Sequence, residues 1–288
     1  MRTKSKLAYF AGLIDGDGTI CISVAYEGTK QQVTKPYMSI GCTTPEICKW
    51  AAKHFGGSQF QYERPDPKHK DVYHWKIASN EALTEIVSQI RPYLLIKRPQ
   101  ADILLEHLAL GRKACPEERL RLAKAIQHAN QNHNDYPPFK RNLSRQEANA
   151  YIAGLIDSEG SLKINPSTRS LQPKIEIPNT NANLIAWLHT HTQGRQYLKE
   201  YENPNHSDLH TWVLYDKKEI EKFLLSILPY IVLKREHALL VLQGVRTPNK
   251  DREPIYLKLQ SIQNSRKSTQ TTNTLDTSQE VKIESAPA

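Results

Sequence analysis

The sequence predicts an α+β fold of two pseudo-twofold-related halves, each with the element order α-β-β-α-β-β-α. Residues 7–18 recur as residues 149–160, with eight residues identical at a spacing of 142. Eight further residues between Trp50 and Ala101 recur at a spacing of 137, without a gap. The repeat covers most of residues 7–245, which indicates two copies of one structural unit. The change in spacing predicts a loss of five residues from the second copy, most simply in its first hairpin turn, around residues 165–172.

Local patterns define the elements of the first half. Strands are expected where β-branched and apolar residues alternate, at residues 19–26, 36–42, 59–63 and 72–78. Helices are expected where the apolar spacing is helical, at residues 45–55, 81–90, 97–110 and 117–129. Thr44 and Ser79 stand at expected N-caps, and Gly56-Gly57 ends the first of these helices.

The boundary between the halves follows from composition. Residues 131–143 combine Asn, His, Pro and charged residues without periodicity, so they are expected to form a linker between residues 1–130 and 144–263. Ser144 and Glu147 match a capping box that opens the second copy of the repeated helix. Residues 264–288 are rich in Ser, Thr, Gln and Asn, which predicts a disordered tail.

The repeated segment is an apolar helix with small residues on one side. Ala8 and Gly12 lie one turn apart, as do Ala150 and Gly154. Small residues at this spacing allow two helix backbones to approach closely, a packing mode best known from membranes. We therefore expect the two copies to pack side by side and to form the pseudo-twofold interface.

Both copies of this helix end in acidic residues, with Asp17 in the first corresponding to Glu159 in the second. A helix C-terminus carries partial negative charge, so carboxylates there are disfavoured unless a cation lies between them. Oxygen ligands of this kind suit Mg²⁺. An ordinary helix stop explains one such ending, but two matching copies favour a shared site. An EF-hand is excluded because Ile20 stands where that loop needs glycine.

The two acidic segments resemble a known motif. Residues 10–18, Phe-Ala-Gly-Leu-Ile-Asp-Gly-Asp-Gly, and residues 152–160, Ile-Ala-Gly-Leu-Ile-Asp-Ser-Glu-Gly, resemble the two signature motifs of a monomeric, two-motif LAGLIDADG homing endonuclease. The resemblance implies two saddle-shaped antiparallel DNA-binding sheets packed through the motif helices. It also implies a monomeric enzyme, encoded by a mobile intron or free-standing, that hydrolyses both strands of a long asymmetric target and leaves short 3′ overhangs.

The resemblance assigns roles to particular residues. Asp17 and Glu159 are expected to hold two or three Mg²⁺ ions, for which Mn²⁺ is expected to substitute, with the backbone carbonyls of Gly16 and Ser158 facing the metal. Asp15 and Asp157 are expected to serve the metal or only the helix ends. Basic residues near the last helix of each half are expected to offset phosphate charge; Lys97 and Lys234 are our choice, and Arg98 and Arg235 are the alternatives. The polar residues Thr44 and Asn181 are also expected near the site, although capping by itself explains Thr44.

One face of each sheet is expected to bind DNA. Polar side chains that alternate along the predicted strands, and basic residues of the hairpin loops, are candidates for contacts in the major groove. These candidate DNA-binding residues are Ser23, Lys35, Arg64, Lys76, Lys163, Lys174, Glu176 and Gln196.

The charge balance supports a polyanionic partner. The formal net charge is +9, and residues 263–288 contribute none of it, so the excess lies on the folded part. We expect an intracellular protein of a bacterial cytoplasm or an organelle matrix, because no apolar run or signal sequence is present and four cysteines lack zinc-site spacing.

His128 and His133 lie too close together for an HNH nuclease, and neither end of the chain suits an intein. The alternative function is a non-cleaving nucleic-acid-binding protein on the same scaffold: an intron RNA maturase or a transcription regulator.

Overall fold

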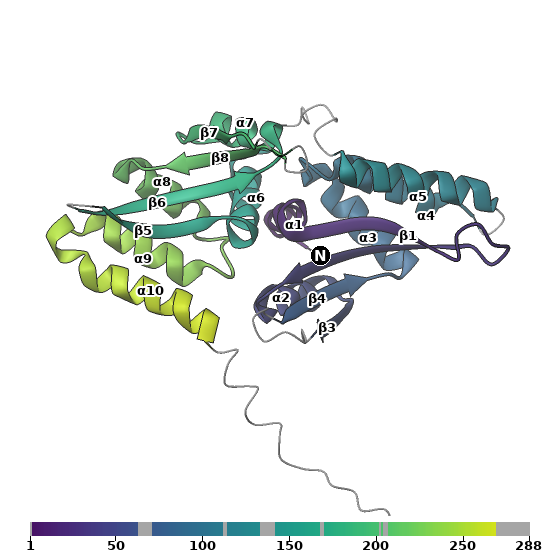
Figure 1. Cartoon of the computed structure of the whole chain (residues 1–288), viewed down its shortest axis with the longest axis horizontal. Helices are drawn as coiled ribbons and strands as arrows, with labels where there is room; N and C mark the ends of the chain where they lie inside the picture. The colour runs from purple at the N-terminus through teal and green to yellow at the C-terminus, as the bar shows by residue number, and fades with distance from the viewer. Residues whose placement is uncertain are drawn as a thin grey trace, which may run out of the picture.

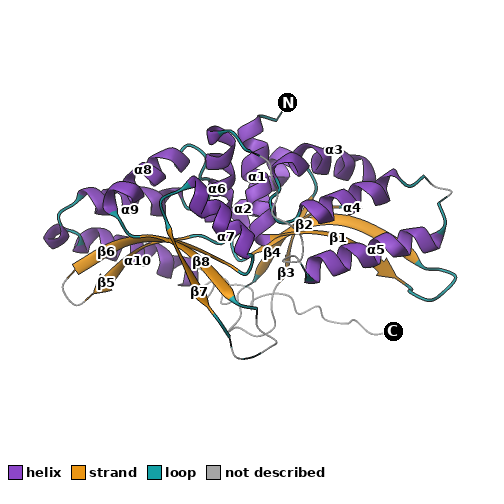
Figure 2. Ribbon diagram, turned by 90° about the horizontal axis from the view of Figure 1, so that it is seen from above, coloured by secondary structure: helices purple, strands orange, loops and turns teal. Residues whose placement is uncertain are grey.

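The computed structural model describes residues 2–62, 71–111, 114–132, 142–167, 170–201, 203 and 207–268. It contains two four-stranded antiparallel sheets with the strand orders β1-β2-β4-β3 and β5-β6-β8-β7. Figure 2 shows most of the helices gathered on one side of both sheets, with α5 and α10 level with the strands, while the opposite side carries little secondary structure. The α+β class and the saddle-like pair of sheets are thus confirmed.

The first half follows the predicted order, and helices are present where residues 97–110 and 117–129 predict them. Its elements are α1 (Lys4–Asp17), β1 (Gly18–Ala25), β2 (Val33–Cys42), α2 (Pro45–Phe55), β3 (Ser58–Tyr62), β4 (Val72–Ile77), α3 (Asn80–Ile90), a 3-10 turn (Arg91–Tyr93), α4 (Arg98–Ala109) and α5 (Pro116–Gln131). Gly56 and Gly57 have φ of 73° and 87°, a conformation that favours glycine, and they end α2 as predicted.

The second half repeats this order. Its elements are α6 (Arg145–Ser158), β5 (Ser161–Ser167), β6 (Ser170–Asn179), α7 (Ala182–His191), β7 (Arg195–Lys199), β8 (Leu209–Leu214), α8 (Lys217–Ile227), α9 (Arg235–Arg246), a 3-10 turn (Asn249–Asp251) and α10 (Glu253–Ser268). Residues 26–32 separate β1 from β2, whereas only residues 168–169 separate β5 from β6. The five missing residues therefore belong to the hairpin turn where the sequence places them.

Helices α1 and α6 lie side by side at the centre of the molecule (Figure 1) and make the most extensive contact between any two elements. A Cβ atom built on Gly12 would lie 2.1 Å from the carbonyl oxygen of Tyr151, and one on Gly154 would lie 2.1 Å from that of Tyr9. Backbone thus meets backbone at both glycines, which confirms the close packing expected from the small residues.

The ends of α6 and α10 bear on the predicted boundaries. Ser144 and Glu147 form the capping box, with the Ser144 hydroxyl accepting from the Glu147 amide and the Glu147 carboxylate accepting from the Ser144 amide. Helix α10 continues to Ser268, past the expected start of the tail at residue 264, and residues 269–288 lie outside the described part. Within the described residues, no helix combines the length and apolar character of a membrane span.

Candidate active site

The C-terminal ends of α1 and α6 meet at the pseudo-twofold axis. A Cβ atom built on Gly16 would lie 2.1 Å from the Ser158 hydroxyl oxygen and 3.4 Å from Cγ of Glu159. A side chain at position 16 would therefore force the Ser158 side chain to shift. The convergence brings together the carboxylates of Asp17, the last residue of α1, and Glu159, which directly follows α6.

The two carboxylates share one electrostatic environment. Partial burial raises the pKa of Asp17, and Lys234 and Lys97 lower it part of the way back. Burial and the negative charge of Asp17 both raise the pKa of Glu159, against the same two lysines. Each acid therefore senses both lysines, although Asp17 remains exposed and Glu159 half-buried. The two helix ends thus form one site with two carboxylates and two lysine ammonium groups.

Lys97 and Lys234 close the two helix ends. The Lys97 ammonium donates to the carbonyl oxygens of Ile14, Asp15, Gly16 and Gly18 at 2.7, 3.0, 3.3 and 2.7 Å. The Lys234 ammonium donates to those of Ile156, Ser158 and Gly160 at 2.7, 3.1 and 2.7 Å. A cation on the last carbonyls of a helix offsets the negative end of its dipole. The two lysines thus supply part of the positive charge that the sequence analysis expected between the two acidic helix ends.

The arginine alternatives lie elsewhere. Arg98 approaches Asp102 at 3.9 Å, and Arg235 donates to the carbonyl of Leu228 at 2.6 Å. The lysines are therefore the cations of the site.

Asp15 and Asp157 are buried and position those lysines. Asp15 accepts from the backbone amides of Leu95, Ile96 and Lys97 at 2.7, 3.1 and 2.9 Å. Asp157 accepts from the amides of Val232, Leu233 and Lys234 at 2.7, 3.0 and 2.8 Å. Of the two roles that the sequence left open, the geometry supports the structural one: each carboxylate holds the segment that carries its lysine.

Two tyrosines, which the sequence analysis did not single out, connect the halves. Tyr151 donates to Asp15 at 2.6 Å and Tyr9 donates to Asp157 at 2.8 Å, so each hydroxyl crosses the helix interface. Burial, followed by the neighbouring carboxylate, raises the pKa of both tyrosines well above its ordinary value, which keeps both as donors. The recurrence of tyrosine at the same position in both motifs was the available signal.

Thr44 and Asn181 both stand at the N-cap position of a helix, but only Asn181 caps its helix with its side chain. The buried side chain of Asn181 caps α7 by accepting from the Leu184 amide at 2.9 Å. Thr44 stands at the N-cap position of α2 but its side chain makes no capping hydrogen bond. The capping explanation for Thr44 was therefore wrong, and capping accounts for Asn181 instead.

The donor set fits a divalent cation. The described residues contain no group of three or more His, Cys, Asp or Glu side chains that could enclose a metal ion. Mg²⁺, however, commonly takes one or two carboxylates and completes its shell with water and substrate phosphate. Asp17 and Glu159 are such carboxylates. The carbonyls of Gly16 and Ser158 already accept from lysine, and each retains a second lone pair for a further contact.

The first sheet presents a polar open face. Ser23 pairs with Lys35, and Ser39 with Lys76, so these side chains point to the side opposite buried Ile40 and Trp75. The Lys76 ammonium lies 4.4 Å from the ring centroid of Tyr37 on the same face. Arg64 lies outside the described residues.

The second sheet has a matching face with one correction. Lys163 and Lys174 both form ion pairs with Glu176 on the open face, and these two lysines help to hold the pKa of Glu176 below its ordinary value. Gln196 instead pairs with the buried Trp212 and so lies on the helix-covered face. The prediction that Gln196 lies on the open face was wrong. The register of β7 places its neighbours Arg195 and Tyr197 on that face and Gln196 on the other.

Aromatic side chains on the open faces were also missed. Phe60 and Tyr197 occupy equivalent positions in β3 and β7, at the spacing of 137, and remain 49% and 45% exposed. Phe60 stacks on His74 with ring centroids 5.0 Å apart. Exposed aromatic rings are suited to stacking on nucleic-acid bases. The sequence shows both aromatic residues within predicted strands, but only the strand register decides which face of the sheet they occupy.

Comparisons with known proteins identify the fold. No protein-family model matches the chain, and no curated protein sequence matches it. The structure is similar to the LAGLIDADG homing endonuclease I-LtrWI bound to target DNA, with a TM-score of 0.65, 18% identity, and coverage of 91% of this chain and 97% of that one. It is also similar to I-GzeII in complex with its DNA target (TM-score 0.64, 13% identity, coverage 88% and 96%) and to I-AabMI bound to uncleaved DNA (TM-score 0.64, 12% identity, coverage 90% and 98%). The chain therefore has the two-half fold of the LAGLIDADG homing endonucleases.

Proposed function

We propose that this protein is a site-specific endonuclease that cuts both strands of a long, asymmetric DNA target with the help of Mg²⁺. The observation that carries the proposal is the meeting of Asp17 and Glu159 at two helix ends, each closed by a lysine. Structural neighbours described as DNA-bound homing endonucleases support the same reading.

Each part of the structure has a role in the proposed reaction. The open faces of the two sheets bind the duplex, and their lysines contact phosphates, so binding weakens steeply with salt. Asp17 and Glu159, with the carbonyls of Gly16 and Ser158, hold the divalent ions, which activate water and stabilise the leaving oxygen. Lys97 and Lys234 keep those carbonyls in place and offset phosphate charge. Because one chain supplies both acids, a monomer suffices to cut both strands.

The test is Mg²⁺-dependent cleavage of a randomised duplex library, followed by sequencing of the cut ends. We expect one enriched long motif with short 3′ overhangs, cleavage with Mn²⁺ in place of Mg²⁺, and none with EDTA. Asp17→Asn with Glu159→Gln should abolish cutting. Glu236→Gln, which alters an exposed acid 3.9 Å from Lys258, is the matched control and should cut normally.

A second outcome would favour a protein that binds nucleic acid without cutting it. Absence of cleavage, together with salt-sensitive retention of DNA or of structured RNA, would refute the nuclease and favour a non-cleaving binding protein. An intron-splicing assay would then separate a maturase from a transcription regulator.

A further inference from the structure

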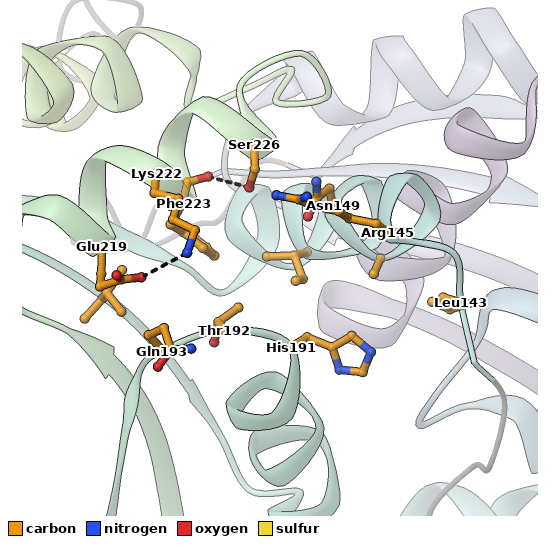
Figure 3. Close-up of a pocket in the computed structure, with 13 residues that line it drawn as sticks. Leu143, Arg145, Asn149, His191, Thr192, Gln193, Glu219, Lys222, Phe223 and Ser226 are labelled. Atoms are coloured by element: carbon orange, nitrogen blue, oxygen red, sulfur yellow. Dashed lines mark hydrogen bonds and ion pairs between the residues drawn. The ribbon is translucent and has the colours of Figure 1, made fainter.

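A second polar site lies at the other end of α6. A cavity of about 350 Å³ opens between α6, α7 and α8, with Arg145 and Asn149 on one side, Thr192 and Gln193 on another, and Lys222 and Phe223 on the third (Figure 3). Arg145 begins the 14-residue helix that ends beside Glu159, and Ile152 lies halfway along it, so the cavity lies roughly 10–20 Å from the site acids at 1.5 Å per residue. Nothing in the proposed cleavage reaction uses it.

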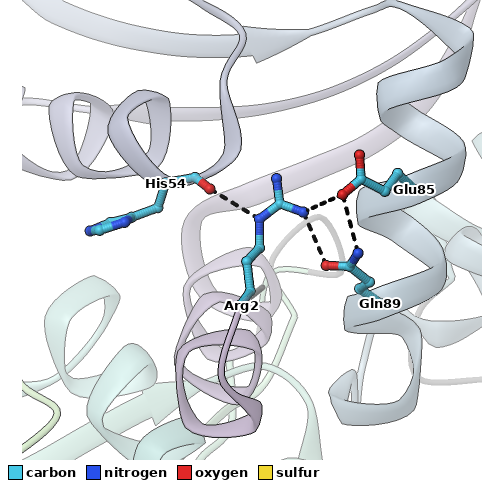
Figure 4. A network of polar contacts seen from close by, with 4 residues as sticks. All are labelled: Arg2, His54, Glu85 and Gln89. Atoms are coloured by element: carbon cyan, nitrogen blue, oxygen red, sulfur yellow. Dashed lines mark hydrogen bonds and ion pairs between the residues drawn. The ribbon is translucent and has the colours of Figure 1, made fainter.

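The equivalent place in the first half is filled by the side chain of Arg2 (Figure 4). Arg2 donates to the Glu85 carboxylate at 2.7 Å, to the Gln89 side chain at 3.0 Å and to the His54 carbonyl at 3.0 Å. Its guanidinium also lies 4.9 Å from the ring centroid of Phe55. In the first half, the Arg2 side chain therefore fills the place that corresponds to the cavity.

Substitutions between the two copies explain why the second half keeps a hollow. At the motif spacing of 142 and the later spacing of 137, four large side chains correspond to smaller ones: Arg2 to Ser144, Lys6 to Ala148, Phe10 to Ile152, and Phe55 to Thr192. Gly56 and Ala82 change the other way, to Gln193 and Glu219, but these side chains line the cavity without filling it. Phe10 and Phe55 stack in the first half with ring centroids 3.8 Å apart. Loss of both rings and of the arginine leaves space that no other side chain of the described residues fills.

The charged side chains around the pocket also differ between the two halves. Glu85, which binds the guanidinium, corresponds to Lys222, and Thr3 corresponds to Arg145. Lys222 meets Glu219 only at 3.9 Å, and Arg145 forms no ion pair within the described residues. Two cations and one carboxylate thus surround a floor that includes Ile152 and Phe223. The first half pairs its carboxylate with its own Arg2, whereas the second half has two cations and one carboxylate around an unfilled cavity.

We propose that this pocket binds a small organic anion: a carboxylate or phosphate monoester carried on a compact apolar body. Arg145 and Lys222 take the anionic group, Asn149 and Gln193 supply further hydrogen bonds, and the ring or aliphatic body rests on Ile152 and Phe223. Cavities of this size with a few convergent polar groups beside apolar surface are typical of ligand sites.

The experiment is calorimetric titration of the full chain with phenyl phosphate and with benzoate. Benzyl alcohol serves as the neutral analogue and inorganic phosphate as the anion without an apolar body. We expect one saturable site for the two organic anions, and binding weaker by about tenfold or more for both comparison compounds. Lys222→Glu and Thr192→Phe, which restore first-half residues, should each abolish binding. Lys218→Glu, an exposed change on the same helix, should leave it intact.

Three results would overturn the proposal. Equal binding of benzyl alcohol would show an apolar cavity without anion selectivity, and equal binding of inorganic phosphate would show an adventitious ion only. Retained binding by both Lys222→Glu and Thr192→Phe, with unchanged melting temperatures, would place the ligand elsewhere. DNA cleavage by the two variants should match the parent protein, so the outcome is independent of the proposed nuclease.

Discussion

Replacing Gly12 by alanine tests how closely α1 and α6 must pack. The new Cβ atom would lie 2.1 Å from the carbonyl oxygen of Tyr151, 3.0 Å from its carbonyl carbon and 3.1 Å from the amide nitrogen of Leu155. All three atoms belong to backbone, so no change of rotamer can relieve the overlap. The two helices would have to move apart.

The expected cost follows from the size of that movement. Ordinary contact begins at 3.4 Å, so the difference from 2.1 Å requires a local separation of 1.3 Å. A gap of about 1 Å already forfeits up to half of the dispersion energy between facing atoms. Overpacking of this severity costs about 3–5 kcal/mol, and alanine recovers about 1 kcal/mol of helix propensity. The net loss of stability is therefore about 2–4 kcal/mol, or roughly 5–10 °C in melting temperature for a chain of this size.

Chemical denaturation and calorimetry would measure the effect against two controls. Gly154→Ala should cost as much as Gly12→Ala, because its Cβ atom would meet the carbonyl oxygen of Tyr9 at 2.1 Å. Gly244→Ala, inside α9, would meet only the terminal methyl of Ile164 at 2.7 Å and should stay within about 1 kcal/mol of the parent. Equal stability of Gly12→Ala and Gly244→Ala would refute the argument from backbone contact.

Three further predictions concern the site. Tyr151→Phe removes one of the hydrogen bonds to the buried Asp15 carboxylate, which keeps its three backbone donors, and should cost about 1–3 kcal/mol, together with slower cleavage; a denaturation midpoint equal to the parent's would contradict the cross-interface role. Asp17→Asn should not lower the melting temperature at neutral pH. Because burial raises the pKa of this carboxyl, its ionisation opposes folding as pH rises through the native pKa, and the variant's advantage should vanish at a pH below the ordinary value of 3.8. Lys97→Met removes a cation that lowers the pKa of both site acids, so the acid limb of the cleavage pH profile should move to higher pH, whereas Arg98→Met should not move it.

Much of the fold was predictable from the sequence because local rules and the internal repeat agreed. Alternation identified the strands, glycines and caps bounded the helices, and the spacings of 142 and 137 located the shorter hairpin turn. Gly12 and Gly154 indicated a close helix pair before any coordinates, since small residues one turn apart have few other uses at such a position. The same reasoning brought Asp17 and Glu159 together.

Other features depended on register and on contacts between distant segments. Gln196 was assigned to the wrong face because a strand's phase is fixed by its partner, and only the pairing with Trp212 reveals it. The choice between Lys97 and Arg98 required the path of the chain into α4, since neighbouring residues at a helix start point in different directions.

The sequence by itself therefore determined the duplicated architecture, the paired motif helices and the two acids at their ends, because these follow from periodicity and from residue types at repeated positions. The tertiary structure alone decided how Tyr9 and Tyr151 cross the interface, how Asp15 and Asp157 hold the two lysines, and that the second half contains a hollow where the first contains Arg2. These contacts join residues 52 to 148 positions apart, and no local rule specifies which side chains meet across such separations.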